Sequence, residues 1–116
     1  MATVLVVDDD AMVRDLVVTI LKLAGHSVLS AENGLEGLML YSSYHAGLDL
    51  VLTDIDMPQM DGIELANRTR AQDDSQRILL MSGRPPGDRK PKNCPFLAKP
   101  FLPKDLIAAV HELMSK

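Results

Sequence analysis

Short apolar runs alternate along the chain with longer segments whose apolar residues recur every three or four positions. The short runs resemble strands covered on both faces, which read as continuous hydrophobic stretches because neither face meets water. The longer segments have the period of amphipathic helices. This alternation predicts an α/β fold, in which helices cover both faces of a mostly parallel sheet. The five runs predicted to be strands are Thr3–Val7, Ser27–Ala31, Leu48–Thr53, Ile78–Met81 and Phe96–Ala98.

Four segments carry the helical pattern. The first is predicted to end at Gly25, because glycine readily adopts the left-handed conformation found after helix ends. The second, near Leu35–Ser43, follows an Asn33-Gly34 turn, and the third begins near Gly62 with Ile63, Leu65 and Ala66 on its apolar side. The last is Pro103–Met114, since proline suits a first helical turn. The residues expected to be buried are Val13, Leu16, Val17, Ile20, Leu21 and Ala24 on the first helix, and Leu106, Ile107, Val110 and Leu113 on the last.

The segment Gly83–Pro95 does not fit this alternation. It contains the four prolines Pro85, Pro86, Pro91 and Pro95. A proline inside a helix removes a hydrogen bond and clashes with the preceding turn, at a cost of about 3 kcal/mol or more. Parallel strands nevertheless need a crossover of about a dozen residues. We therefore expect a loop or a single short turn between the fourth and fifth strands.

Length and composition limit the classes of protein. The chain has 116 residues, 47% of them hydrophobic, which suits one domain over residues 1–116 and excludes a disordered chain. A net charge of −4 argues against nucleic acid or a membrane as partner. No segment approaches the roughly 20 apolar residues of a membrane span, and the acids from Asp8 onward are unlike a signal peptide. Cys94 is the only cysteine, which excludes an internal disulfide and favours a cytoplasmic location.

Acidic residues follow two of the predicted strands. Asp8, Asp9 and Asp10 follow the first strand, and Asp54 follows the third. Ligands of doubly wound sheets bind outside the carboxyl ends of the strands, so these carboxylates are expected to converge. Like charges at short distance repel, and a divalent cation that prefers oxygen ligands, such as Mg²⁺, relieves the repulsion. The pattern predicts a metal-dependent site for phosphoryl groups, although Asp10 alone is better interpreted as the N-cap of the first helix.

The residues at the strand ends resemble the receiver domain of bacterial two-component response regulators. The resemblance covers the whole chain and rests on motifs that occur in the same order as in that family. It implies a flavodoxin-like fold, with a doubly wound five-stranded parallel sheet of order 2-1-3-4-5. The motifs are Val7-Asp8-Asp9, Thr53-Asp54-Ile55-Asp56-Met57-Pro58, Met60-Asp61-Gly62, Met81-Ser82-Gly83 and Lys99-Pro100-Phe101.

The resemblance also implies how the acids act. Asp54 would be the phosphoacceptor, taking a phosphoryl group from the phosphohistidine of a histidine kinase or a histidine phosphotransfer protein. Asp8, Asp9 and Asp54 would bind Mg²⁺ together with the backbone carbonyl of Asp56. This ligand set suits Mg²⁺, which uses few carboxylates and keeps several waters. The chain would then be a signalling domain that hydrolyses its own phosphoryl group slowly, and not an enzyme.

Three further residues would respond to the phosphoryl group in the same family. Lys99 would neutralise one phosphoryl oxygen, and the hydroxyl of Ser82 would donate a hydrogen bond to another. Ser82 and Phe96 would form the conformational switch, with the hydroxyl moving toward the phosphoryl group and the ring turning inward. Such a switch is a population shift between two packings.

Two features depart from the usual family pattern. The Pro-rich segment replaces the usual fourth helix, as in some stand-alone receivers and some receivers attached to histidine kinases. It carries Arg84, Arg89, Lys90 and Lys92 against Asp88, a local charge of +3, so it either orders around the phosphorylated site, docks an acidic partner, or is a solvated loop. Arg84 lies two residues after Ser82, and we expect it to contact Asp56 and to modulate the lifetime of the phosphorylated state.

Other functions are less consistent with the sequence. Asp54-Ile55-Asp56 matches the Asp-x-Asp motif of haloacid-dehalogenase-like phosphatases, but those enzymes carry it after their first strand. A flavodoxin-like cofactor binder needs a phosphate loop after the first strand, where Asp8–Asp10 would repel phosphate. The downstream partner cannot be read from the sequence. Met1 just before the first strand favours a stand-alone receiver over a domain cut from a longer protein.

Overall fold

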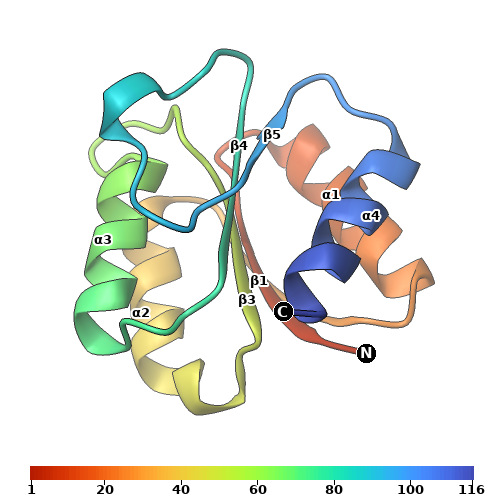
Figure 1. The fold of residues 1–116 in the computed structure, drawn as a ribbon, viewed down its shortest axis with the longest axis horizontal. Helices are drawn as coiled ribbons and strands as arrows, with labels where there is room; N and C mark the ends of the chain where they lie inside the picture. Colours follow the sequence, from red (N-terminus) through yellow and green to blue (C-terminus); the bar gives the residue numbers. More distant parts are fainter.

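A computed structural model describes residues 1–116 and has a five-stranded parallel sheet at its centre (Figure 1). The strand order is β2-β1-β3-β4-β5, which confirms the predicted doubly wound fold. Strand order reverses between β1 and β3, so the ligand-binding crevice of this fold is expected at their carboxyl ends. The strands are β1 (Thr3–Val7), β2 (Ser27–Ala31), β3 (Leu50–Asp54), β4 (Ile78–Ser82) and β5 (Phe96–Ala98).

Two helices cover each face of the sheet (Figure 1). The helices α1 (Ala11–Leu23) and α4 (Pro103–Met114) lie on one face, and α2 (Gly34–Tyr44) and α3 (Gly62–Gln72) on the other. A short 3-10 helix, η1 (His45–Gly47), follows α2. None of these helices has the length and apolarity needed to cross a bilayer.

Polar side chains at the N-caps begin the first three of these helices. Asp10 accepts hydrogen bonds from the amides of Met12 and Val13, at 3.0 and 3.3 Å, which confirms its predicted capping role. Asn33 caps α2 and Asp61 caps α3 in the same way. Each cap satisfies backbone N–H groups that have no partner within the helix.

The sheet separates two apolar cores. Alternate residues of a strand point to opposite faces, so Leu5 and Val7 pack toward α2 and α3, whereas Val4 and Val6 pack toward α1 and α4. The same alternation continues through β3 and β4, whose residues are buried throughout. This two-sided burial is the reason why the strands read as uninterrupted apolar runs.

Several predicted details of burial are wrong. Leu16 and Ile107 are 53% and 39% exposed and Ala24 is exposed, because each lies beside the stripe that faces the sheet, and Ala24 follows the last residue of α1. Leu48 is buried, but its amide donates to the carbonyl of His45 in η1, so the third strand begins only at Leu50. Cys94, in the loop before β5, is also buried, in the core beside α2 and α3.

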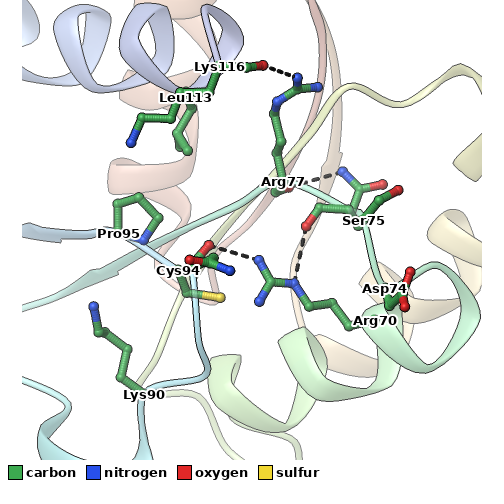
Figure 2. A pocket seen from close by; sticks show the side chains of 11 residues that line it. Arg70, Asp74, Ser75, Arg77, Lys90, Cys94, Pro95, Leu113 and Lys116 are labelled. Atoms are coloured by element: carbon green, nitrogen blue, oxygen red, sulfur yellow. Dashed lines mark hydrogen bonds between the residues drawn. The ribbon is translucent and has the colours of Figure 1, made fainter.

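The connection between β4 and β5 has no α-helix, as its prolines predicted. It contains one turn of 3-10 helix, η2 (Gly87–Arg89), and runs beside α3 (Figure 1). We call residues 84–95 the strap. Arg70 of α3 holds it in place, donating from Nη2 to the carbonyl of Asn93 at 2.8 Å (Figure 2). Nη1 of Arg70 also donates to the carbonyl of Lys92.

Both chain ends lie at the amino ends of the strands. Met1 and Ala2 precede β1, and the amide of Ala2 donates to Nδ1 of His26 at 3.0 Å. The carbonyl of Lys116 accepts a hydrogen bond from Arg77, the residue before β4. The acids that follow β1 and end β3 are therefore at the opposite end of the sheet from both termini.

Candidate functional site

Three carboxylates meet at the carboxyl ends of β1 and β3. Asp8 and Asp54 are buried and Asp9 is exposed. One oxygen from each of the three lies within 4.8 Å of the others. The structure thus brings together three of the residues that the sequence suggested as metal ligands, whereas Asp10 is turned to the N-terminus of α1.

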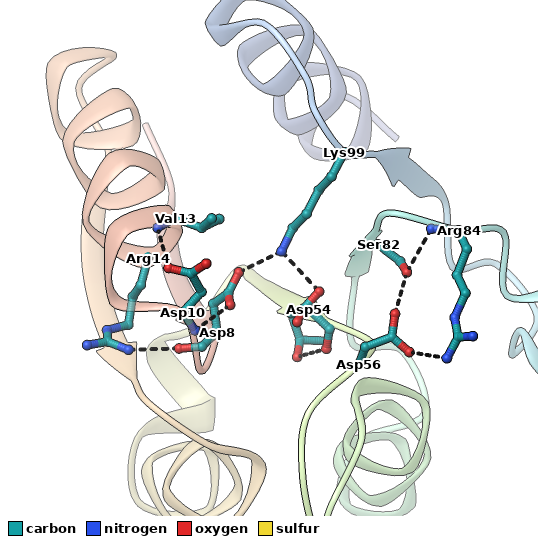
Figure 3. A network of polar contacts seen from close by, with 10 residues as sticks. Asp8, Asp10, Val13, Arg14, Asp54, Asp56, Ser82, Arg84 and Lys99 are labelled. Carbon is teal, nitrogen blue, oxygen red and sulfur yellow. Dashed lines mark hydrogen bonds and ion pairs between the residues drawn. The ribbon is translucent and has the colours of Figure 1, made fainter.

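Lys99 follows the carboxyl end of β5 and hydrogen-bonds to both buried acids. Its Nζ donates to Oδ2 of Asp8 and to Oδ1 of Asp54, each at 3.0 Å (Figure 3). The Lys99 amide donates to the carbonyl of Ser82 at 2.8 Å, which fixes the backbone of Lys99 beside the end of β4. The Lys99-Pro100 peptide is cis. The lysine therefore offsets part of the repulsion between the acids.

The surroundings shift the ionisation of both partners. Burial raises the pKa of Asp54 to about 6, against the opposing effect of its hydrogen bond to Lys99. Burial alone would lower the pKa of Lys99, but its hydrogen bonds to Asp8 and Asp54 outweigh it and the pKa is raised. At neutral pH the lysine is charged and Asp54 is mainly a carboxylate, the form that can act as a nucleophile.

A glycine allows α3 to begin directly against β3. A Cβ atom at Gly62 would overlap the carbonyl oxygen of Asp54. The Gly62 amide donates to the carbonyl of Ile55 at 2.9 Å, which closes the loop after Asp54. The Met60-Asp61-Gly62 motif therefore has a steric explanation: no larger residue fits at position 62 without moving the site.

Ser82, Asp56 and Arg84 form a second polar group, which we call the clip. The Ser82 hydroxyl donates to Oδ2 of Asp56 at 2.9 Å, and Nη2 of Arg84 lies 3.1 Å from Oδ1 of the same carboxylate (Figure 3). The Arg84 amide donates to the Ser82 hydroxyl at 3.2 Å. The hydrogen bonds that Asp56 accepts lower its pKa; the bond from Arg84 has the larger effect and the bond from Ser82 the smaller one. The contact expected between Asp56 and Arg84 is present.

Two contacts that hold the strap were missed by sequence reasoning. Arg89 pairs with Asp61, the N-cap of α3, so one aspartate both begins the helix and anchors the strap. The only signal in the sequence was the excess of cations in the strap, which did not indicate their partners. The fixation of the strap by Arg70 left no signal either, because its acceptors are backbone carbonyls.

Phe96 is the remaining predicted site residue. Phe96 in β5 is partly buried and packs against the core beside α2 and α3. A groove of about 530 Å³ lies at the amino ends of β4 and β5 (Figure 2). Asp54 does not line it, since it ends β3 at the opposite end of the sheet. Its charged lining residues are Arg70, Arg77, Lys90, Lys116 and Asp74.

Comparison with known proteins agrees with this geometry. The family model for the response regulator receiver domain matches residues 4–111. The chain belongs to this family. The receiver domain is 32% identical to the response regulator receiver protein CpdR of Brucella abortus, over 98% of each chain. It is 34% identical to a part of the sensor kinase CckA of the same organism, covering 99% of this chain and 13% of the kinase.

Solved structures share the receiver fold. The chemotaxis protein CheY4 of Vibrio cholerae is 30% identical, with a TM-score of 0.89 over 97% of this chain and 98% of that one. The receiver domain spans about half the length of other curated relatives, which are named as probable transcriptional regulators.

Proposed function

We propose that this receiver domain is the phosphoacceptor module of a two-component phosphorelay, with Asp54 as the acceptor. The observation that carries the proposal is Lys99 bridging Asp8 and Asp54 at 3.0 Å, with an Asp9 oxygen beside both acids. A buried nucleophile next to a fixed cation suits phosphoryl transfer, which depends on positioning and charge neutralisation. The proposed donor is the phosphohistidine of a histidine kinase or a histidine phosphotransfer protein, and the proposed location is the cytoplasm.

The transfer needs one nucleophilic oxygen. Oδ1 of Asp54 accepts from Lys99, while Oδ2 accepts no hydrogen bond from the protein and is the oxygen we assign to the attack. The Oδ2–P bond forms as the P–N bond of phosphohistidine breaks. The imidazole nitrogen keeps the electron pair and takes a proton from water. The product is an acyl phosphate on Asp54.

The acid cluster fits Mg²⁺. Asp8, Asp9 and Asp54 supply clustered carboxylate oxygens, and the backbone carbonyl of Asp56 would complete the protein ligands. A bound Mg²⁺ would supply positive charge for the carboxylates and for the phosphoryl oxygens.

Three residues would respond to the phosphoryl group. Lys99 would exchange part of its bond to Asp54 for a phosphoryl oxygen. Ser82 would donate to another oxygen, and the partly buried Phe96 would turn inward, so that these two residues form the switch. We propose that Asp56 and Arg84 flank the path of an attacking water and so modulate the lifetime of the acyl phosphate.

The geometry disfavours the phosphatase alternative. In a haloacid-dehalogenase-like enzyme the second aspartate of Asp54-Ile55-Asp56 would be a general acid, which must hold a proton near neutral pH. Arg84 and Ser82 instead lower the pKa of Asp56. The carboxylate is therefore stabilised in the form that cannot donate a proton.

The test is the intact mass of the protein after incubation with Mg²⁺ and acetyl phosphate. We expect one phosphoryl adduct on the wild type and on Asp10→Asn, in which asparagine keeps the helix cap. We expect none on Asp54→Ala or in the presence of a magnesium chelator. Following the adduct over time in Arg84→Ala tests the proposed effect on lifetime. An adduct on Asp54→Ala would exclude Asp54 as the sole acceptor.

A further inference from the structure

The clip shows where the Ser82 hydroxyl is held in this structure. The side chain of Ser82 is buried, and its single proton is donated to Oδ2 of Asp56 and not to Asp54 (Figure 3). The hydroxyl oxygen in turn accepts from the Arg84 amide. The hydroxyl therefore acts both as a hydrogen-bond donor and as an acceptor within the clip.

We propose that Asp56 is a positioning residue that holds Ser82 in the unphosphorylated arrangement and so opposes the phosphorylated one. This inference rests on the proposed function, because it requires a phosphoryl group on Asp54. A serine hydroxyl has one proton, so it cannot donate to Asp56 and to a phosphoryl oxygen at the same time. Each phosphorylation event must break the bond between Ser82 and Asp56.

Arg84 contacts both Ser82 and Asp56 and supports the hydrogen bond between them. Its guanidinium holds Oδ1 of Asp56 at 3.1 Å while its amide holds the Ser82 oxygen at 3.2 Å, so one residue positions both partners. A hydrogen bond to a charged carboxylate is stronger than one to a neutral acceptor. The Asp56 side chain is 46% exposed, which weakens the bond through competition with water.

The strap is anchored independently of Ser82. Arg84 begins the strap, and Arg89 of the strap pairs with Asp61. When Ser82 moves away, the Asp56–Arg84 pair loses its hydrogen bond to the serine hydroxyl. The Arg89–Asp61 pair does not involve Ser82 and stays in place. The arrangement near Ser82 can therefore change without detaching the whole strap.

The experiment is a double-mutant cycle on the affinity for beryllium fluoride, a phosphoryl mimic, at saturating Mg²⁺. We expect Asp56→Ala to bind the mimic roughly three- to tenfold more tightly than the wild type, as expected for the loss of one partly exposed charged hydrogen bond. In the Ser82→Ala background the same substitution should change the affinity less than twofold. The difference between the two backgrounds isolates the coupling between Asp56 and Ser82.

Two controls separate the clip from general charge effects. Asp61→Asn removes one negative charge near the strap, keeps the helix cap, and should not reproduce the gain. The affinity of each variant for Mg²⁺ alone, followed by the amide resonances of Asp8 and Asp9, corrects for changed metal binding. The Arg84 amide resonance should shift in Asp56→Ala, because its acceptor, the Ser82 hydroxyl, loses its own partner.

The outcomes are distinct. An equal gain in both backgrounds would mean that Asp56 acts through its charge alone, and no gain in either would show that it does not restrain Ser82; both results overturn the inference. If beryllium fluoride binds to neither the wild type nor any variant, the proposed function fails and the inference fails with it. Binding with the expected coupling supports both.

Discussion

Asp54 is more difficult to ionise than an ordinary aspartate because of where the fold places it. It is buried at the end of β3, near two other acids, and a single lysine bridges it to one of them. Burial raises its pKa to about 6, and the negative charges of Asp8 and Asp9 act in the same direction. The proposed phosphoacceptor is therefore a source of instability in the folded chain.

The first prediction concerns the pH dependence of this instability. The pKa of Asp54 is higher folded than unfolded, so the folded state binds more protons between about pH 4 and 6 and its stability falls as the pH rises through that range. Asp54→Asn removes the ionisation. We expect this variant to gain stability over the wild type as the pH rises, reaching on the order of 1–3 kcal/mol at pH 7.

Urea unfolding at several pH values, in the presence of a magnesium chelator, measures this difference. Asp15→Asn, at an exposed position of α1, is the control and should follow the wild type. A constant offset between Asp54→Asn and the wild type from pH 4 to 7 would show that the ionisation of Asp54 does not affect stability.

At the scale of single residues, the sequence predicted a residue's role where its chemical type and its position at a strand or helix end indicated the same role. Asp8, Asp9 and Asp54 could be placed together because the carboxyl ends of neighbouring parallel strands meet at one edge. Asp10 could be separated from them because aspartate is a favoured N-cap. The predicted burial of Leu16 was wrong, since a helical spacing rule does not define how far the sheet covers the sides of a helix.

The strap connects β4 to β5 without an α-helix. Its path depends on contacts distant in sequence: Arg70 holds the carbonyls of Lys92 and Asn93, and Arg89 pairs with Asp61. The prolines predicted that no regular helix would form, but they contained no information on this path. The guanidinium of Arg70 also donates to the carbonyl of Gln76 at 3.2 Å, so one side chain joins α3, the strap and the turn before β4.

The second prediction follows from these three acceptors. Arg70→Ala leaves all of them without a protein donor, and we expect the free energy of unfolding to fall by about 1–2 kcal/mol. Hydrogen exchange should accelerate at the amides of Lys90 and of residues 92–94 more than in the sheet. Arg68→Ala is the matched control, because Arg68 makes only an exposed pair with Glu64 on the same helix.

For Arg68→Ala the expected loss is below about 0.5 kcal/mol, the usual value of an exposed pair between residues four apart. If the two alanine variants lose the same stability, the hydrogen bonds of Arg70 do not hold the strap. If exchange accelerates equally everywhere, Arg70 supports the whole molecule and not one segment.

At the scale of the whole molecule, the acid cluster links the proposed binding of Mg²⁺ to folding. The oxygens of Asp8, Asp9 and Asp54 come from two strand ends and are close together only when the sheet is formed. A ligand that binds the folded state alone stabilises it by mass action. The fold and the proposed metal site should therefore strengthen each other.

The third prediction is a thermal shift by Mg²⁺. At a concentration ten times the dissociation constant the gain is about 1.4 kcal/mol, or about 5 °C in the melting temperature for a chain of this length. Asp9→Asn should lose most of this shift. Asp10→Asn should keep it, because asparagine retains the N-cap and Asp10 does not join the cluster. A similar shift in both variants would mean that Mg²⁺ binds elsewhere.

The overall architecture was the part best predicted from the sequence. The alternation of apolar runs and helical segments predicted the α/β class, and the resemblance to the family predicted the strand order. The clip could be predicted only as a contact between Asp56 and Arg84. That Ser82 is its third member depends on a hydroxyl rotation, which no pattern in the sequence specifies.

Both chain ends lie beyond the amino ends of the strands, away from Asp54. A fluorescent protein or an affinity tag joined to either end would extend away from the acids and leave them open to a phosphate donor. The same placement lets one such unit be spliced into longer polypeptides without obstructing its chemistry. It accounts in physical terms for how similar sequences can make up about half of one protein and 13% of another.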